Sequence, residues 1–272
     1  MTLLRAEGLS KSYGVPKQGA WFAHERLKAV DGVSLELEAG RTLGIVGESG
    51  SGKSTLARLL TALEQPSEGR VLFEGQDLFK LSSSALRAAR LHFQMVFENP
   101  MASLNPRHKA GEIVAEPLEV HGLAKGAQLR DRAAALLVQV GLEAAMLERY
   151  PHEFSGGQRQ RLMIARAIST APKLLVADEP LSSLDVSVQA QILELLKKLR
   201  AESGMAMVFI SHDLRVVRGL CDEAMVMKDG EVVEQGPVEG LWASPRHPYT
   251  RELLASVLPL PPALRARREG RA

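Results

Sequence analysis

The stretch that decides the fold is GIVGESGSGKST, residues 44–55. Residues 41–47 are mostly apolar, which favours a buried strand, and residues 54–63 have the apolar spacing of a helix. Between the two lie Gly47, four further residues, and then Gly52, Lys53 and Ser54. Glycines let the backbone turn its N–H groups inward, and the positive end of the following helix adds to them. The stretch predicts a strand, a loop that cradles phosphate groups, and a helix.

Two side chains of this loop suit a nucleotide. We expect Lys53 to reach the β- and γ-phosphates of ATP and the Ser54 hydroxyl to bind Mg²⁺. A chance glycine-rich turn is the alternative, but it would not require both the strand before it and the helix after it. The predicted nucleotide-binding residues here are Gly47, Glu48, Ser49, Gly50, Ser51, Gly52, Lys53, Ser54 and Thr55.

Two later strands end in residues with catalytic side chains. Residues 173–180, KLLVADEP, are apolar on both faces, as in a buried parallel strand. We expect Asp178 at its end to hold Mg²⁺, and Glu179 to orient and deprotonate an attacking water. His212 ends the next predicted strand. A lone histidine is more often structural, but this one lies at the sheet edge where ligands bind.

A second glycine turn occurs in SGGQRQR, which begins at Ser155. Ser155 and Gln158 have the spacing of a capping box, which starts a helix. A cap does not require two glycines, whereas a backbone that approaches an anion closely does favour them. Because a helical region separates this turn from the first one, we expect a two-fold dimer. In it, each chain's residues 155–158 would cover the phosphate held by the other chain.

Five motifs in this order resemble the ATP-binding subunits of ABC transporters: GESGSGKST, FSGGQRQR, LLVADEP, SSLD and SHD. The resemblance implies an α/β P-loop NTPase fold with a mixed parallel core sheet, an N-terminal antiparallel β subdomain and a helical subdomain. It also implies an ATPase domain over residues 1–235, with the helical subdomain inserted at about 83–170. Residues 236–272 would be a short C-terminal extension.

The same resemblance implies a role for each motif residue. Tyr13 would stack on adenine, and Ser155, Gly156 and Gly157 would contact the partner's γ-phosphate. His212 would sense the γ-phosphate, and Asp185 would link the two sites across the dimer. ATP and Mg²⁺ are the implied ligands.

Two stretches indicate which branch of the ABC transporter ATPases the sequence resembles. Residues 94–107, QMVFENPMASLNPR, and residues 244–261, SPRHPYTRELLASVLPLP, resemble the ATPases of dipeptide, oligopeptide and nickel importers. The implied function is import of a small nutrient, with peptides first and nickel as the alternative. The implied partners are a second ATPase subunit (a paralogue or a copy), two membrane permease subunits docked near the helical subdomain and, indirectly, an extracytoplasmic solute-binding protein. For HPYT in the second stretch, packing against the sheet edge and a partner contact remain equal alternatives.

One residue departs from the family pattern. Glu98 stands where the family has a glutamine that touches Mg²⁺ and the attacking water, and Gln94, four residues earlier, is the weaker substitute. A carboxylate also binds Mg²⁺. We therefore expect Glu98 to keep a metal contact and to alter the Mg²⁺ dependence or the coupling, although a variant without consequence is an equal alternative.

Composition and charge indicate which other classes of function are less favoured. The chain has 272 residues, a net charge of +2 and one cysteine, Cys221. This charge does not favour a nucleic-acid partner, so a soluble ABC-type ATPase acting on DNA or ribosomes is the weaker alternative. A small-molecule kinase would not need SGGQ. With no signal-peptide layout and no long apolar run, we expect a peripheral protein on the cytoplasmic face of the inner membrane.

The remaining patterns predict local structure. Residues 14–28 are expected to form a loop, and residues 83–171 to be largely helical. The Asp-Gly pair at 229–230 between two apolar runs predicts a hairpin. The tail after Leu258 is expected to be a solvated, flexible segment.

Overall fold

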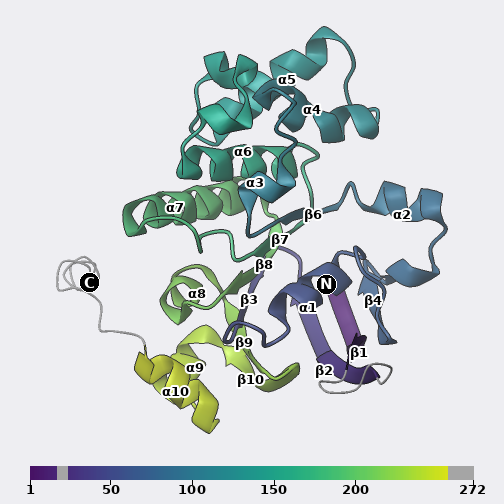
Figure 1. Cartoon of the computed structure of the whole chain (residues 1–272), viewed down its shortest axis with the longest axis vertical. Coiled ribbons are helices and arrows are strands. Elements are labelled where there is room, and N and C mark those ends of the chain that lie inside the picture. The colour runs from purple at the N-terminus through teal and green to yellow at the C-terminus, as the bar shows by residue number, and fades with distance from the viewer. Residues whose placement is uncertain (17–23, 257–272) are drawn as a thin grey trace.

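The computed structural model describes residues 1–16 and 24–256 (Figure 1). Two sheets lie in the body of the molecule, and a group of helices forms a separate lobe at one end. The tail after Leu258 lies outside the described residues, so its predicted flexibility stays a prediction.

The larger sheet has the strand order β10-β9-β3-β8-β7-β6. All its neighbouring pairs are parallel except β9 with β10. Its strands are β3 (Thr42–Val46), β6 (Phe93–Val96), β7 (Leu174–Asp178), β8 (Ala206–Ser211), β9 (Glu223–Lys228) and β10 (Glu231–Pro237). Every residue of β3, β7 and β8 is buried. The predicted strands at 41–47 and 173–180, and the strand predicted to end at His212, are therefore confirmed.

Local connections in this sheet also follow the sequence. Helix α7 (Val186–Ser203) links the parallel strands β7 and β8, and Gly204 ends it in the left-handed conformation, with φ 67°. Asp229 and Gly230 both have positive φ, 51° and 86°, at the tip of the β9–β10 hairpin. This backbone twist matches that of the flanking strands, which explains the Asp-Gly signal.

The smaller sheet is antiparallel, with the order β2-β1-β4-β5. Its strands are β1 (Thr2–Pro16), β2 (His24–Glu38), β4 (Glu68–Phe73) and β5 (Gln76–Asp77). The prediction of a loop over residues 14–28 was wrong at both ends, because Gly14 pairs with Arg26 and Pro16 with His24. Residues 26–28 are exposed, so this part of the hairpin has no alternating apolar face that a sequence pattern would reveal.

The helical lobe lies between β6 and β7 in the chain and shares a core with the larger sheet. The region from 83 to 171 is largely helical, as predicted, but it also contains β6, which the sequence analysis missed. β6 has four residues and, among the described strands, pairs only with β7 at the sheet edge, so its apolar pattern is too short to distinguish it. The helices of this region are α2 (Ser83–Ala89), α3 (Pro100–Ser103), α4 (Ala110–Val120), α5 (Ala127–Gln139), η2 (Ala144–Glu148), η3 (Pro151–Glu153) and α6 (Gly156–Ile168).

The remaining helices lie around the two sheets. They are α1 (Lys53–Leu60), η1 (Leu78–Lys80), α8 (Leu214–Leu220), α9 (Val238–Ala243) and α10 (Pro248–Ser256). Figure 1 shows α9 and α10 beside the β9–β10 hairpin. Within residues 1–16 and 24–256, no helix combines the length and the apolar character needed to cross a membrane.

Candidate functional site

The loop between β3 and α1 requires its glycines. Gly52 caps α1 with φ 98°, and no side chain caps this helix start. A Cβ at Gly52 would lie 2.1 Å from the Ala29 carbonyl oxygen, and one at Gly47 would lie 2.3 Å from that of Met227. Helix starts without a side-chain cap leave N–H groups available to an anion. The loop therefore has the geometry of a phosphate cradle.

Lys53 places a buried cation inside this loop. Its side chain is 4% exposed, and Nζ donates to the carbonyl oxygens of Gly47 at 2.9 Å and Glu48 at 2.7 Å. Nζ also lies 3.5 Å from Oε1 of Glu179. A phosphate oxygen would be a stronger partner for this ammonium than neutral carbonyl groups.

Ser54 and Asp178 come together from α1 and the end of β7. The Ser54 hydroxyl donates to Oδ1 of Asp178 at 3.0 Å. Burial raises the pKa of the Asp178 carboxyl, the Ser54 hydrogen bond lowers it, and the charges of Glu179 and Glu98 raise it further. A cation would relieve this cost of burying a negative charge.

These donors fit the magnesium ion that the family implies. A hydroxyl and a carboxylate are hard oxygen ligands of the kind that Mg²⁺ takes from proteins. Across the described part of the chain, no group of three His, Cys, Asp or Glu side chains could hold a metal by itself. Mg²⁺ usually keeps waters and shares phosphate oxygens with its substrate, so one carboxylate and one hydroxyl suffice.

Glu179 lies between Lys53 and His212. Its carboxylate is 2.8 Å from Nδ1 of His212, whose side chain is 60% exposed. Its backbone has φ 44°, an uncommon value for a residue other than glycine, and its N–H donates to the Ile210 carbonyl at 3.1 Å. Such backbone strain is concentrated at functional sites. β8 ends at Ser211, one residue before the predicted end at His212.

Tyr13 lies on β1, close to the first turn of α1. Its hydroxyl donates to Oε1 of Glu64 at 2.6 Å, and burial followed by this hydrogen bond raises the pKa of the phenol. The hydroxyl of Thr55 also interacts with the phenol. The aromatic ring is therefore fixed beside the loop, where an adenine could stack on it.

The second glycine turn starts α6 as the sequence predicts. The Gln158 N–H donates to Oγ of Ser155 at 3.3 Å, and the Ser155 N–H donates to Oε1 of Gln158 at 2.9 Å. This confirms the capping box. A Cβ at Gly157 would lie 2.5 Å from Cγ1 of Val188 on α7, whereas one at Gly156 would make an ordinary contact with Leu184. The turn thus packs against the region around α7.

Asp185 caps α7, the helix against which this turn packs. Its Oδ1 accepts from the Val188 N–H at 3.0 Å and from the Ser187 hydroxyl at 2.7 Å. The Ser187 hydrogen bond and then the Val188 one lower the pKa of the Asp185 carboxyl. A structural role as helix cap is therefore visible for Asp185 within one chain.

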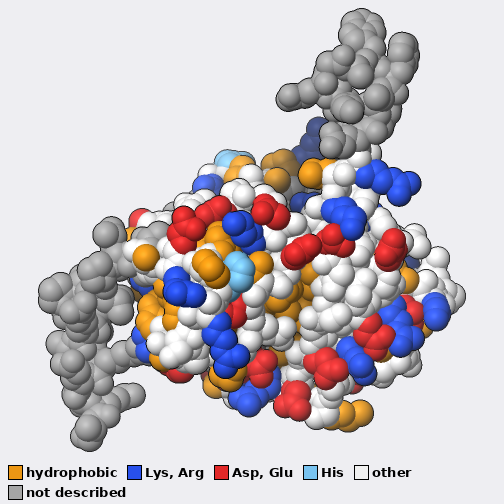
Figure 2. Space-filling model, turned by 90° about the horizontal axis from the view of Figure 1, so that it is seen from below, with side chains coloured by type: hydrophobic (Ala, Val, Ile, Leu, Met, Phe, Trp, Pro, Cys, Tyr) orange, Lys and Arg blue, Asp and Glu red, His pale blue; other side chains and the backbone are white. Residues whose placement is uncertain are grey.

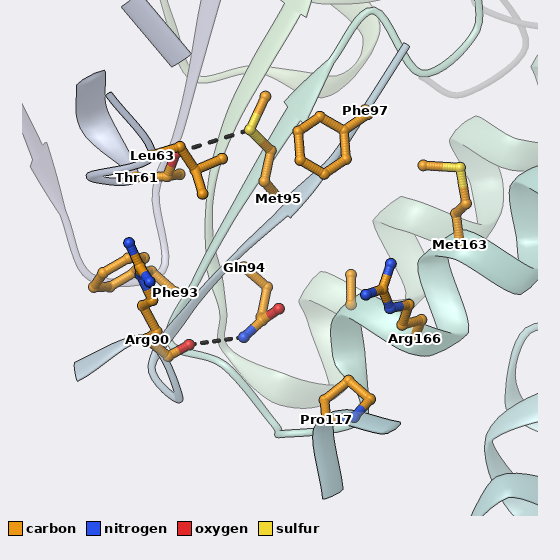
Figure 3. Close-up of a pocket in the computed structure, with 11 residues that line it drawn as sticks. Thr61, Leu63, Arg90, Phe93, Gln94, Met95, Phe97, Pro117, Met163 and Arg166 are labelled. Carbon is orange, nitrogen blue, oxygen red and sulfur yellow. Dashed lines mark hydrogen bonds between the residues drawn. The ribbon is translucent and has the colours of Figure 1, made fainter. Parts of the chain in front are cut away.

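Glu98 and Gln94 occupy different places. The charge of Glu98 reaches Asp178, whereas Nε2 of Gln94 donates to the Arg90 carbonyl at 2.7 Å. Gln94 lines a pocket between β6 and helices α4 and α6, which Pro117 and Arg166 also line (Figure 3). Of the two residues, only Glu98 is near the other acidic groups.

The surface carries both signs of charge. On the face drawn in Figure 2, basic and acidic side chains are interspersed over most of the described surface. On this face, the mixture does not form the basic patch that nucleic-acid binding favours.

One contact to the nucleotide loop escaped the sequence analysis. The Glu48 N–H donates to the hydroxyl of Tyr249, on α10, at 3.0 Å. The only signal was the motif HPYT, for which packing at the sheet edge and a partner contact had been equal alternatives.

Fold and site together define a P-loop ATPase cassette. The ABC transporter family model matches residues 30–182, and the chain belongs to this family. It is 50% identical to the dipeptide transport ATP-binding protein DppF of Escherichia coli (strain K12), over 96% of this chain and 78% of that protein. It is 48% identical to the oligopeptide transport ATP-binding protein OppF of Salmonella typhimurium (strain LT2), over 90% and 73%.

A solved structure has the same fold. The dimeric ATP-binding cassette MJ0796, in a post-hydrolysis state bound to ADP and Pi, superposes with a TM-score of 0.77. It is 32% identical, and the match covers 87% of this chain and 99% of that one. The expected ABC ATPase fold class is confirmed.

Proposed function

We propose that this chain is the ATP-hydrolysing subunit that powers import of di- or oligopeptides through an ABC transporter complex. The observation that carries the enzymatic part is the convergence of Lys53, Asp178 and Glu179 at the glycine loop. Lys53 lies 3.5 Å from Glu179, and Asp178 lies 3.0 Å from the hydroxyl of Ser54. The names of the curated relatives support the peptide class. Nickel remains the alternative solute.

Phosphoryl transfer to water depends on positioning and charge neutralisation. Lys53 exchanges loop carbonyls for phosphate oxygens, and Tyr13 stacks on the adenine. Ser54 and Asp178 would hold Mg²⁺, with Glu98 as a further ligand, and the bound ion would supply neutralisation of charge on the phosphates. Glu179 takes a proton from the attacking water, and His212 orients Glu179 through the contact at Nδ1.

A second ATPase subunit completes each site. Residues 155–158 form the capped first turn of α6. They cover the nucleotide held by the partner subunit. Asp185 connects the two sites because it caps α7, which packs against Gly157. ATP binding closes the dimer and hydrolysis opens it. The other subunit is a paralogue or a second copy.

The membrane partners are two permease subunits, and a solute-binding protein acts indirectly. We place their docking at the pocket of Figure 3, which lies between the edge strand β6 and the helical lobe and next to the segment that carries Glu98. If nucleotide binding moves Glu98, the movement would reach this pocket through the adjacent residue Phe97, which lines it. The protein then works peripherally, at the cytoplasmic face of the inner membrane.

The test is co-purification followed by activity. Tagged protein is purified from its own cells in mild detergent, every accompanying chain is identified, and the complex is assayed for ATP hydrolysis with and without peptide and receptor. Two multi-span proteins and peptide-stimulated hydrolysis are expected, and the same complex carrying Glu179→Gln should be inactive. Recovery with ribosomes or nucleic acid instead would contradict the transport function. Stimulation of hydrolysis by nickel alone would identify nickel, and not peptides, as the transported solute.

A further inference from the structure

The C-terminal segment reaches the nucleotide loop through Tyr249. This residue lies in the first turn of α10, and its side chain is 4% exposed. Its hydroxyl oxygen accepts the hydrogen bond from the Glu48 N–H at 3.0 Å, although 201 positions separate the two residues in the chain. The second residue of the glycine loop is thus tied to a helix that none of the nucleotide motifs includes.

Two contacts of its own and the anchoring of the preceding segment hold the tyrosine in place. Nζ of Lys228, at the end of β9, lies 4.9 Å from the centroid of its ring. Its own N–H donates to Nδ1 of His247 at 3.2 Å. The segment before α10 is anchored on β10, because Glu234 accepts hydrogen bonds from the N–H groups of Arg246 at 2.8 Å and His247 at 3.0 Å. The tyrosine is therefore fixed to the sheet by the HPYT motif and not by chance surface packing.

The backbone of Glu48 passes this constraint to the catalytic lysine. The carbonyl oxygen of Glu48 accepts from Nζ of Lys53 at 2.7 Å and from the Ser51 N–H at 3.2 Å. The residue is thus bound on both sides, by Tyr249 at its N–H and by the rest of the loop at its carbonyl. A shift of this backbone would move the oxygen that orients Lys53. Small displacements of positioning groups have large effects on reacting geometry.

We propose that Tyr249 is a positioning residue for ATP binding, and that it fixes the glycine loop and Lys53 through the backbone of Glu48. This inference rests on the proposed ATPase function. It gives the C-terminal segment a role in this chain's own nucleotide site, in addition to any contact with a partner. Burial raises the pKa of the Tyr249 phenol, so its hydroxyl stays protonated at neutral pH.

The test compares Tyr249→Phe with wild type in the full chain. Phenylalanine keeps the ring, its burial and the Lys228 contact, and it removes only the hydroxyl that accepts from the Glu48 N–H. We expect ATP affinity, measured calorimetrically, to fall about fivefold, because a hydrogen bond of this kind has about that effect. The KM for ATP should rise with it, and the ATP-induced increase in Tm should shrink. The Tm without nucleotide should stay close to that of wild type.

The matched control is Tyr150→Phe, which removes the hydroxyl of a tyrosine in the helical lobe, and it should bind ATP as wild type does. If Tyr249→Phe and wild type have equal ATP affinity and KM, the inference is overturned. Equal losses of Tm with and without ATP would also overturn it, since the hydroxyl would then only secure α10. Failure of wild type itself to bind and hydrolyse ATP would instead contradict the proposed function.

Discussion

Two helix starts in this molecule are rich in glycine, and they need it for different reasons. In the loop before α1, Gly52 has φ 98° and approaches a backbone carbonyl, so a larger residue is excluded by the chain itself. In the turn before α6, a serine caps the helix, and Gly156 has room for a Cβ beside Leu184. Glycine at the first site serves the fold and the ligand together, whereas Gly156 is not demanded by this chain's own packing.

The comparison extends to how complete each region is. The first loop already surrounds a buried lysine and meets Asp178, Glu179 and Tyr249 within one chain. The second turn has a satisfied cap and an exposed serine, and its described contacts lie around α7. The first loop is complete within one chain, whereas the second turn is open at the surface. This difference suits a site that two subunits share.

The largest effect is expected at the carboxylate beside the first loop. Glu179→Gln should lower kcat by about 10²- to 10⁴-fold, because general-base catalysis contributes on that scale. ATP affinity should change little, since Lys53 and the loop remain. Single-turnover hydrolysis and equilibrium ATP binding measure the two quantities separately. Unchanged kcat would show that Glu179 is not the base.

Gly52→Ala tests the claim that the first loop is demanded by the fold. The Cβ would lie 2.1 Å from the Ala29 carbonyl oxygen, at a φ that non-glycine residues rarely adopt. We expect the free energy of unfolding without nucleotide to fall by about 3 kcal/mol or more. Urea titration measures it. Gly75→Ala is a control for positive φ alone, because φ is 80° there and nothing lies within 4 Å of the added Cβ.

Gly156→Ala and Gly157→Ala separate packing from partner contact in the second turn. Gly157→Ala should destabilise the single chain by about 1–3 kcal/mol, because the methyl group meets the stiff side chain of Val188. Gly156→Ala should leave stability unchanged or slightly raised, while ATP hydrolysis by the assembled complex falls at least about tenfold. Thermal melts of the chain and ATPase assays of the complex distinguish them. Full activity of Gly156→Ala would remove the proposed contact with the partner's nucleotide.

The smallest effect is expected at Glu98, which lies between the two regions in the chain. Glu98→Gln should shift the Mg²⁺ concentration for half-maximal ATPase rate by up to about tenfold, because groups around a metal tune its affinity on that scale. Glu119→Gln, at an exposed glutamate of α4, serves as the control. Coincident Mg²⁺ titration curves for Glu98→Gln and wild type would show that the glutamate has no metal role.

Much of the fold was predictable because its strongest patterns are local. The buried strands β3, β7 and β8 are apolar on both faces, and the Asp-Gly hairpin depends on two adjacent residues. β6 and the paired ends of β1 and β2 were missed for a common reason. Each is short or exposed, and pairing with another part of the chain holds it as a strand, so its own residues carry little pattern.

The sequence alone determined the chemical groups of the site and the elements that carry them: the glycine loop, Lys53 and Ser54 on a helix start, Asp178 and Glu179 at a strand end, and a capped helix start at Ser155. These follow from spacing over a few residues, where backbone geometry is fixed by near neighbours. Only the tertiary structure decided that Val188 fills the space beside Gly157 and that Tyr249 holds the Glu48 N–H. Such contacts join distant segments, and their partners are set by how the elements pack, which no local pattern contains.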